Sequence, residues 1–188
     1  MAILDQQTPH PETVPYRDLA VRTGAVIALV LTVLGLIMYV AGLNETMMRN
    51  KALNWGNNLL SFGIAFYFIF TALKNHRQND LGGYLSTGRG IGFGTLAGVV
   101  MGVVSAVWVW VFMTYVDTEL IEVIRRVAIE DMERQGLDEG QIEQSMKYAA
   151  PFMSAGFIAS MTVFFGIFTG FLAGLFSGLI LKRQPSTM

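Results

Sequence analysis

The sequence contains no cysteine and only two histidines among its 188 residues. The absence of cysteine excludes a disulfide framework, a thiolate nucleophile and a cysteine-based metal site. His10 falls in a polar tail and His76 in an expected short loop, and neither has a partner at the spacing of a metal-ligand pair. No Ser-His-Asp arrangement can be assembled, because no histidine lies near an outer loop or within a long apolar run. We therefore predict a protein that is not an enzyme and that has no cofactor and no metal site.

Charged residues are also scarce: they make up 14% of the chain, against roughly 25% in soluble domains. Asp, Glu, Lys, Arg and His are absent from four segments, at 23–43, 57–73, 90–116 and 148–181. A helix needs roughly 17–25 residues to cross the hydrocarbon core of a bilayer. The last segment is longer than that, so we expect its helix to occupy about 152–181. The pattern predicts an all-α integral membrane bundle of four spanning helices.

The lack of ionisable residues in these runs also restricts the function. Pumps and proton-coupled transporters keep such residues at membrane depth, and four helices leave little room for the inverted repeats of secondary transporters. A coupled transporter is therefore disfavoured. The net charge of −1 gives no electrostatic reason to expect binding to nucleic acid.

Glycine, by contrast, is abundant and regularly spaced in the third and fourth runs. Two stripes recur at every fourth residue, one formed by Gly90, Gly94, Gly98 and Gly102 and the other by Gly166, Gly170, Gly174 and Gly178. In water each such glycine would weaken a helix by about 1 kcal/mol relative to alanine. In a bilayer, a stripe of small residues lets two helices approach closely. We predict that these eight residues are helix-packing positions. The two spans are expected to pair within one chain, and homo-oligomerisation through one stripe is the alternative.

Four spans place both chain termini on one side of the membrane. On that side six Lys and Arg residues adjoin the apolar runs, namely Arg22, Lys74, Arg77, Arg89, Lys182 and Arg183. Such residues favour the cytoplasmic side of a membrane. Aromatic residues that suit the headgroup zone fall near the opposite ends of the runs: Tyr39, Trp55, Trp110, Tyr115 and Tyr148. We expect both termini to be cytoplasmic.

The chain is expected to form one membrane domain over residues 23–183. Residues 1–22 are polar and contain three prolines, so we expect a disordered cytoplasmic tail. Residues 184–188 are expected to form a short C-terminal tail.

The one sizeable polar region is 117–150, with nine acidic and four basic residues. Apolar residues recur at three- and four-residue steps over 120–132, which predicts an amphipathic helix. Gly136 suits its end, and Asp138 followed by Gln141 predicts a capping box that starts a second helix. We expect an extramembrane helical hairpin between the third and fourth spans, on the side opposite the termini.

This hairpin is the strongest candidate for a binding surface. Its candidate partner-facing residues are Glu130, Asp131, Glu133, Glu139 and Glu143. An acidic surface of this kind suits a protein partner, a peptide or a divalent cation. The alternative is a solvated connection without a partner, because charge runs on helices are commonly solvated faces. The negative charge argues against anionic lipid as the ligand of the hairpin.

Several short segments resemble a bacterial family of four-span membrane proteins. The segments are Gly82-Gly83-Tyr84-Leu85-Ser86, Asp131-Met132-Glu133 with Gly136, Gln141-Ile142-Glu143, Pro151 and Ser177-Gly178-Leu179-Ile180-Leu181-Lys182-Arg183. Their order and spacing are similar to those of domain-of-unknown-function family 4199. The resemblance covers most of the chain from about residue 20. It implies a four-span topology and a bacterial inner-membrane setting, and it implies no activity.

Together these observations lead to a non-enzymatic integral membrane protein of unknown biochemical function. The leading hypothesis is a structural or adaptor component that packs through its glycine stripes, contacts the lipid bilayer and offers the hairpin to a protein partner. The alternative is a small uncoupled channel or permease that works as a homo-oligomer. An enzyme acting on lipid ranks third, because no acid–base pair can be assembled for it.

Overall fold

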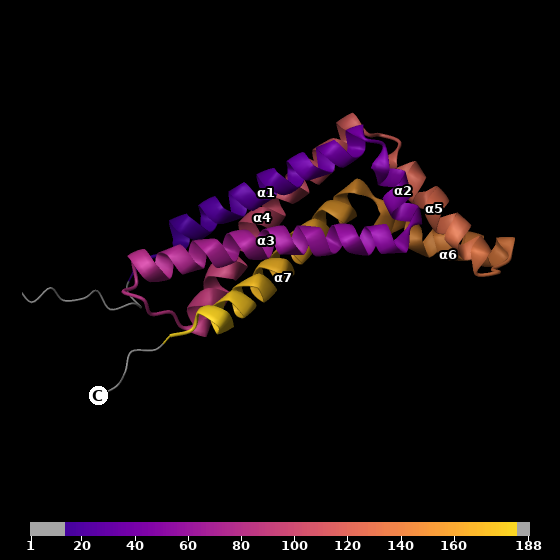
Figure 1. Ribbon diagram of the computed structural model, residues 1–188. Helices are drawn as coiled ribbons and strands as arrows, with labels where there is room; N and C mark the ends of the chain where they lie inside the picture. Colours follow the sequence, from indigo (N-terminus) through magenta and orange to yellow (C-terminus); the bar gives the residue numbers. More distant parts are fainter. Residues whose placement is uncertain (1–13, 184–188) are drawn as a thin grey trace, which may run out of the picture. The chain divides into compact units, whose positions relative to one another are not determined.

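The computed structural model describes residues 14–183 and confirms the all-α class. Over that range it contains seven α-helices and no β-strand, apart from one isolated antiparallel bridge between Leu85 and Arg183 (Figure 1). The predictions made for residues 1–13, which include His10, and for the C-terminal tail at 184–188 lie outside the described residues.

Four of the helices are long and apolar enough to cross a membrane. They are α1 (Arg17–Val40), α3 (Lys51–Asn79), α4 (Thr87–Val111) with its π-helical extension η1 (Phe112–Val116), and α7 (Ala155–Leu181). The chain is therefore a multi-pass membrane protein. The charge-free runs of the sequence lie mostly within these four helices.

Two of these helices extend beyond the apolar runs that predict them. Helix α1 begins at Arg17, six residues before the expected start, and α3 covers 51–79 where the apolar run covers 57–73. The ends of a helix are set by its backbone hydrogen bonds, whereas an apolar run marks only the part of the helix that suits the lipid hydrocarbon. Asp18 in the first turn of α1 and Arg77 in the last turn of α3 also complement the helix dipoles.

The segment 44–56 separates the first two apolar runs, and it contains most of the short helix α2 (Leu43–Arg49) and the start of α3. Gly42 turns the chain in the left-handed region at φ 67°. The Oδ1 atom of Asn50 then accepts hydrogen bonds from the backbone N–H groups of Ala52 and Leu53, at 3.0 and 3.2 Å. This is the side-chain cap that a helix N-terminus needs, so α3 starts directly after α2.

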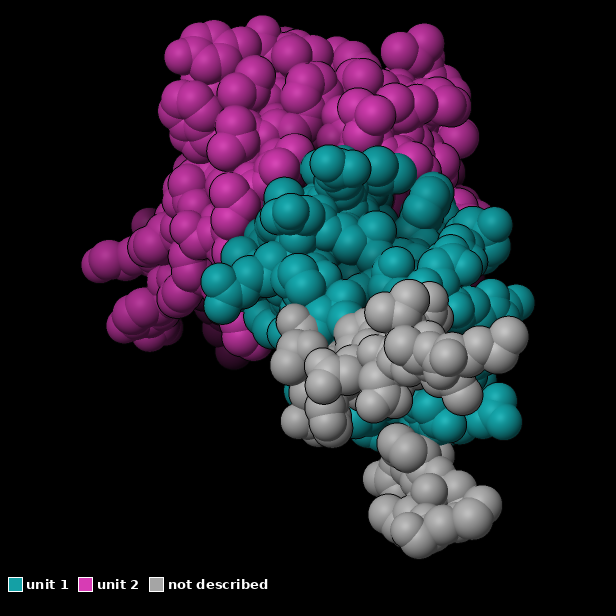
Figure 2. Space-filling view, turned by 90° about the vertical axis from the view of Figure 1, so that its left-hand side faces the viewer, with its two compact units in different colours: residues 1–27, 62–101, 166–188 teal, residues 28–61, 102–165 magenta. Residues whose placement is uncertain are grey.

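The chain divides into two compact units, drawn in different colours in Figure 2. Unit 1 consists of residues 1–27, 62–101 and 166–188, and unit 2 consists of residues 28–61 and 102–165. Unit 1 holds the beginning of α1, the ends of α3 and α7, and most of α4. Unit 2 holds α2 and the helices between α4 and α7.

In unit 1 the two glycine stripes lie directly against each other, in antiparallel register. The pairs in contact are Gly90 with Gly178, Gly94 with Gly174 and Gly98 with Gly170. A Cβ atom added to Gly94 would lie 2.5 Å from the Cα of Gly174, and one added to Gly98 would lie 2.9 Å from the Cα of Gly170. Real Cβ atoms essentially never come within 3.0 Å of another heavy atom. Helices α4 and α7 therefore touch backbone to backbone.

The remaining members of the stripes pack less symmetrically. In unit 2, Gly102 meets Val163 instead of a glycine, since an added Cβ would lie 3.0 Å from the Cα of Val163. Gly166 is buried, and its carbonyl oxygen would lie 2.6 Å from a Cβ on Gly98. Two close contacts lie outside both stripes, and one of them is made by Gly24 of α1, where an added Cβ would lie 2.9 Å from the Cβ of Val100 on α4. The sequence reasoning missed this glycine because it is not part of a repeat.

Replacing Gly94 with alanine tests the contact between α4 and α7. The new methyl group meets backbone atoms, which cannot rotate away, so the helices must separate. We expect Gly94→Ala to lower the free energy of unfolding by about 1–3 kcal/mol, as overpacking does, measured by thermal unfolding in mild detergent. Gly63→Ala in α3 is the matched control, because an added Cβ there meets nothing within 4 Å. Equal stability of the two variants would contradict the contact.

Candidate functional site

The polar hairpin of unit 2 is formed by α5 (Leu120–Arg134) and α6 (Glu139–Ala149), and we call it the acidic hairpin. Its turn is made by backbone geometry that the sequence predicts. Gly136 has φ 81°, in the left-handed region. Its N–H donates to the carbonyl of Glu133 at 2.9 Å, and the N–H of Leu137 donates to that of Met132 at 3.3 Å. These two bonds form a Schellman motif, which ends α5 with its last carbonyls satisfied.

The predicted capping box at the start of α6 is confirmed. Oδ1 of Asp138 accepts a hydrogen bond from the backbone N–H of Gln141 at 2.8 Å. In return, the backbone N–H of Asp138 donates to Oε1 of Gln141 at 3.0 Å. Local hydrogen bonds therefore end α5 and start α6. The turn between the two helices is determined by residues of the hairpin itself.

Helix α5 is the centre of this part of unit 2. It contacts α2, α6 and the short 3₁₀ turn η2 (Ala150–Met153). Leu120 at its start is buried, and the other apolar residues of its stripe are half-buried. Contact with three neighbours therefore covers the apolar side of α5 only in part.

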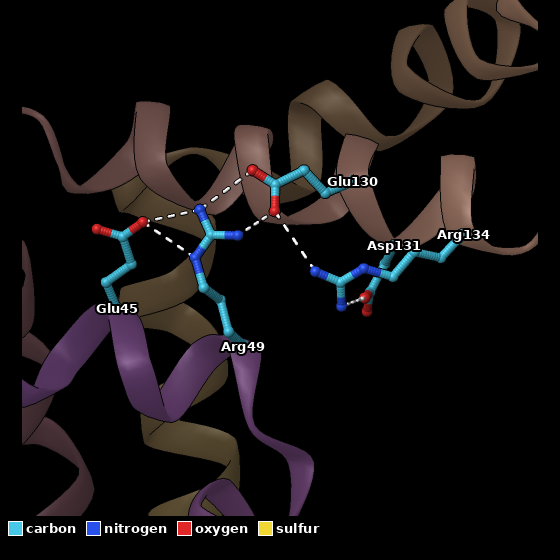
Figure 3. Close-up of polar contacts among 5 residues, drawn as sticks. All are labelled: Glu45, Arg49, Glu130, Asp131 and Arg134. Carbon is cyan, nitrogen blue, oxygen red and sulfur yellow. Dashed lines mark hydrogen bonds and ion pairs between the residues drawn. The ribbon is translucent and has the colours of Figure 1, made fainter.

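An ion pair links α5 to α2 across 81 residues of sequence. The Nη1 atom of Arg49 donates to Oε2 of Glu130, and Nη2 donates to Oε1 of the same carboxylate at 3.1 Å (Figure 3). Two parallel bonds between a guanidinium and a carboxylate give strong geometric specificity. The two side chains are 33% and 30% exposed, so the pair is partly shielded from water.

Three more charged residues extend this pair into a network. The carboxylate of Glu45 accepts hydrogen bonds from Nε and Nη2 of Arg49, at 3.0 and 2.8 Å. On the other side, Arg134 lies 3.7 Å from Glu130 and 3.5 Å from Asp131. Figure 3 shows all five side chains pointing into one cluster, with α2 on one side and α5 on the other.

The network shifts the titration of its two central groups. The hydrogen bond from Arg49 is the main cause that lowers the pKa of the Glu130 carboxyl, and desolvation opposes it. The hydrogen bonds to Glu130 and then to Glu45 raise the pKa of Arg49. Both shifts favour the charged forms, so the attraction between α2 and α5 persists to more acidic pH than an ordinary carboxyl would allow.

The five predicted partner-facing acids fall into two groups. Glu130 and Asp131 are engaged within the chain, by Arg49 and Arg134. Glu133, Glu139 and Glu143 are exposed, and their carboxylates make no hydrogen bond or ion pair with the residues that the structure describes. The sequence could not separate the groups, because Glu130 owes its role to an arginine on a distant helix.

Within residues 14–183, no group of three or more His, Asp or Glu side chains is placed to hold a metal ion. The accessible carboxylates of the acidic hairpin instead form a dispersed negative surface. Such a surface suits electrostatic recognition of a cationic partner.

A second polar cluster lies in unit 1, where the sequence reasoning was wrong about His76. His76 was expected in a short loop, but it lies in the last turn of α3 and is only 3% exposed. Nδ1 lies 2.7 Å from Oδ2 of Asp80, and Nε2 lies 3.4 Å from Nη2 of Arg89. Because arginine only donates, Nε2 accepts and Nδ1 carries the proton toward Asp80. The spacing of four residues between His76 and Asp80 was the available local signal.

Arg89 joins this cluster to the start of the described chain. Its guanidinium donates to the carbonyl oxygen of Val14 and lies 5.2 Å from the ring centroid of Tyr16. Tyr16 also lies against Gly92, where an added Cβ would meet its hydroxyl at 2.6 Å. The segment before α1 is therefore fastened to α4 by an arginine and a tyrosine.

The family model named "Protein of unknown function (DUF4199)" matches residues 22–183 of the chain. The matched range includes every segment on which the sequence resemblance rests, and it confirms that resemblance. No curated protein and no solved structure matches the chain.

The pKa shift of Glu130 predicts an acid-dependent loss of stability. A carboxyl whose folded pKa lies below its unfolded value, here 4.5, stabilises the fold above that value. The stabilisation is lost as the pH falls through the lower folded pKa. We expect Glu130→Gln to melt below the wild type at pH 7 and the gap to close between pH 4.5 and more acidic conditions, measured by thermal unfolding in detergent.

Glu133→Gln provides the control, because Glu133 makes no ion pair with the described residues. Its melting temperature is expected to follow the wild type at every pH. A gap for Glu130→Gln that stays constant down to pH 3 would show that the ion pair does not stabilise the fold.

Proposed function

The chain belongs to the DUF4199 family of proteins of unknown function, and we propose that it is a non-enzymatic membrane adaptor. In this proposal the four apolar helices anchor the protein in the bilayer. The acidic hairpin then serves as the docking surface for a partner protein. The single observation that carries the proposal is the presence of exposed, uncommitted carboxylates on a hairpin that is otherwise fastened at several points.

The contrast between committed and free charges supports this role. The network of Arg49, Glu130 and Arg134 holds α5 against α2, and the capping box fixes the start of α6. Glu133, Glu139 and Glu143 contribute nothing to these contacts and remain exposed. A surface that is positioned in advance loses less conformational entropy when it binds.

The charges define the chemistry of the partner. An accessible negative surface favours a protein surface or peptide rich in Lys and Arg. An anionic lipid surface would be repelled. We propose that the contact is made on the side of the membrane opposite the chain termini.

The distribution of residues supports that orientation. All six span-flanking cations fall in unit 1, and the five interfacial aromatics Tyr39, Trp55, Trp110, Tyr115 and Tyr148 fall in unit 2 with the acidic hairpin. We propose a bacterial inner-membrane location with both termini in the cytoplasm, because cations next to spans favour that side.

Zero-length crosslinking tests the proposed docking. A carbodiimide joins carboxylates to lysine amines that touch them, so it reports this contact directly. We expect a partner crosslinked to the wild type and to the charge-conserving triple variant Glu133→Asp, Glu139→Asp, Glu143→Asp. We expect at least a tenfold loss of that product in the corresponding triple Gln variant, measured by mass spectrometry of the purified membrane complex.

Thermal unfolding of the two triple variants serves as the control. Both triple variants are expected to insert and to melt like the wild type, because the three carboxylates make no ion pair or hydrogen bond with the described residues. An unchanged product in the Gln variant would contradict docking through these acids. A partner-free homo-oligomer that conducts ions in liposomes would support a channel in place of an adaptor.

A further inference from the structure

Cationic side chains from α3 and from the end of α7 come together at one end of unit 1. The Nη1 atom of Arg77 donates to the carbonyl oxygen of Leu181, the last residue of α7, at 3.1 Å. Two backbone hydrogen bonds of 3.1 Å join Leu85 to Arg183. The first contact places Arg77 beside the end of α7, where Lys182 and Arg183 follow, and Lys74 lies one helical turn before Arg77 on α3. We call these four residues the cationic cluster.

Three of the four charged side chains of this cluster are exposed. Lys74, Lys182 and the side chain of Arg183 are exposed and make no hydrogen bond or ion pair with the described residues. The Nε atom of Arg77 is buried and has no acceptor among them. Among its described residues unit 1 has two acidic residues, Asp18 and Asp80, against seven Lys and Arg, and the carboxylate of Asp80 lies 2.7 Å from Nδ1 of His76. The local charge balance is therefore strongly positive.

Apolar surface lies directly next to these charges on the same helix. Leu179 and Ile180 precede Leu181 and are 54% and 63% exposed, and Phe176 one turn earlier is 47% exposed. In a spanning helix such side chains face acyl chains. The cations thus sit at the level where a spanning helix ends, with lipid-facing residues immediately below them.

We propose that the cationic cluster binds the phosphate headgroup of an anionic phospholipid, whose acyl chains lie along the exposed side of α7. Arginine and lysine complement each other in this site. The guanidinium of Arg77 is held in a fixed position by its bond to the carbonyl oxygen of Leu181, and a planar guanidinium suits a phosphate oxygen. The lysines supply mobile point charges near the water. A headgroup bound here would reinforce the joint between the ends of α3 and α7.

A free phosphate ion shares the headgroup chemistry but not the apolar contact. We commit to the lipid because exposed apolar residues of α7 lie close to the cations, within two to six residues of Lys182. Inorganic phosphate therefore serves as the discriminating probe. This proposal is independent of the adaptor role, since it concerns purified protein and lipid without a partner.

Lipid titration of the full chain in mild detergent tests the proposal. Bound phosphatidylglycerol, counted by native mass spectrometry, is compared for the wild type and the double variant Lys74→Gln, Lys182→Gln. Each cation near an anionic surface contributes about fivefold in affinity. We therefore expect the double variant to bind phosphatidylglycerol about 25-fold more weakly, and phosphatidylcholine to bind neither protein measurably.

The matched control is Arg17→Gln with Arg22→Gln, which removes two exposed cations from α1 in the same unit. This control is expected to retain the wild-type affinity within twofold. Equal weakening in both double variants would overturn the site in favour of a general charge effect. Competition by inorganic phosphate at the concentration of the lipid would overturn the lipid as the ligand. All variants are first checked for wild-type thermal unfolding without lipid, which the exposure of the four substituted side chains leads us to expect.

Discussion

The structure depends on the direct contact between the backbones of α4 and α7. Lipid tails are as apolar as leucine, so a bilayer provides no hydrophobic driving force for two helices to associate. Van der Waals contact between the helices must drive their association instead. Glycine at three successive turns of each helix removes the side chains that would keep the axes apart. The same residues would weaken a helix in water, where exposed backbone competes for solvent. This contact therefore links the glycine composition of the chain to its environment.

The two units of the chain differ in their charged residues. Unit 1 carries the close glycine pairs, the polar cluster of His76, Asp80 and Arg89, and the exposed cations, with few acids. Unit 2 carries the acidic hairpin and the aromatics suited to the headgroup zone. The exposed surface of unit 1 is thus mainly positive and suits anionic headgroups. That of unit 2 is mainly negative and suits a basic protein. The proposed adaptor role uses the second surface and leaves the first available for the proposed binding of an anionic headgroup.

The features that local sequence predicts are those determined by local physics. Charge-free runs predict the four long helices because helix length and hydrocarbon thickness are matched, and Gly136 with Asp138 predicts the turn because its bonds are made within a few residues. Helix α2, the pair of Arg49 with Glu130 and the contact of Gly24 with α4 escaped prediction. Each depends on which distant segment comes near, and no local pattern carries that information. Hydropathy also misplaced His76, because a buried histidine at a helix end is stabilised by partners that a composition window does not show.

Solid-state NMR on protein labelled with ¹³C at the glycine α-carbons, in lipid bilayers, measures the central contact most directly. The α-carbons of Gly94 and Gly174 lie within about 4 Å, since an added Cβ on one would be 2.5 Å from the other and a carbon–carbon bond adds about 1.5 Å. The account predicts inter-residue glycine cross-peaks that persist when labelled protein is diluted into unlabelled protein. Helical glycine signals without such cross-peaks, or cross-peaks that vanish on dilution, would contradict it.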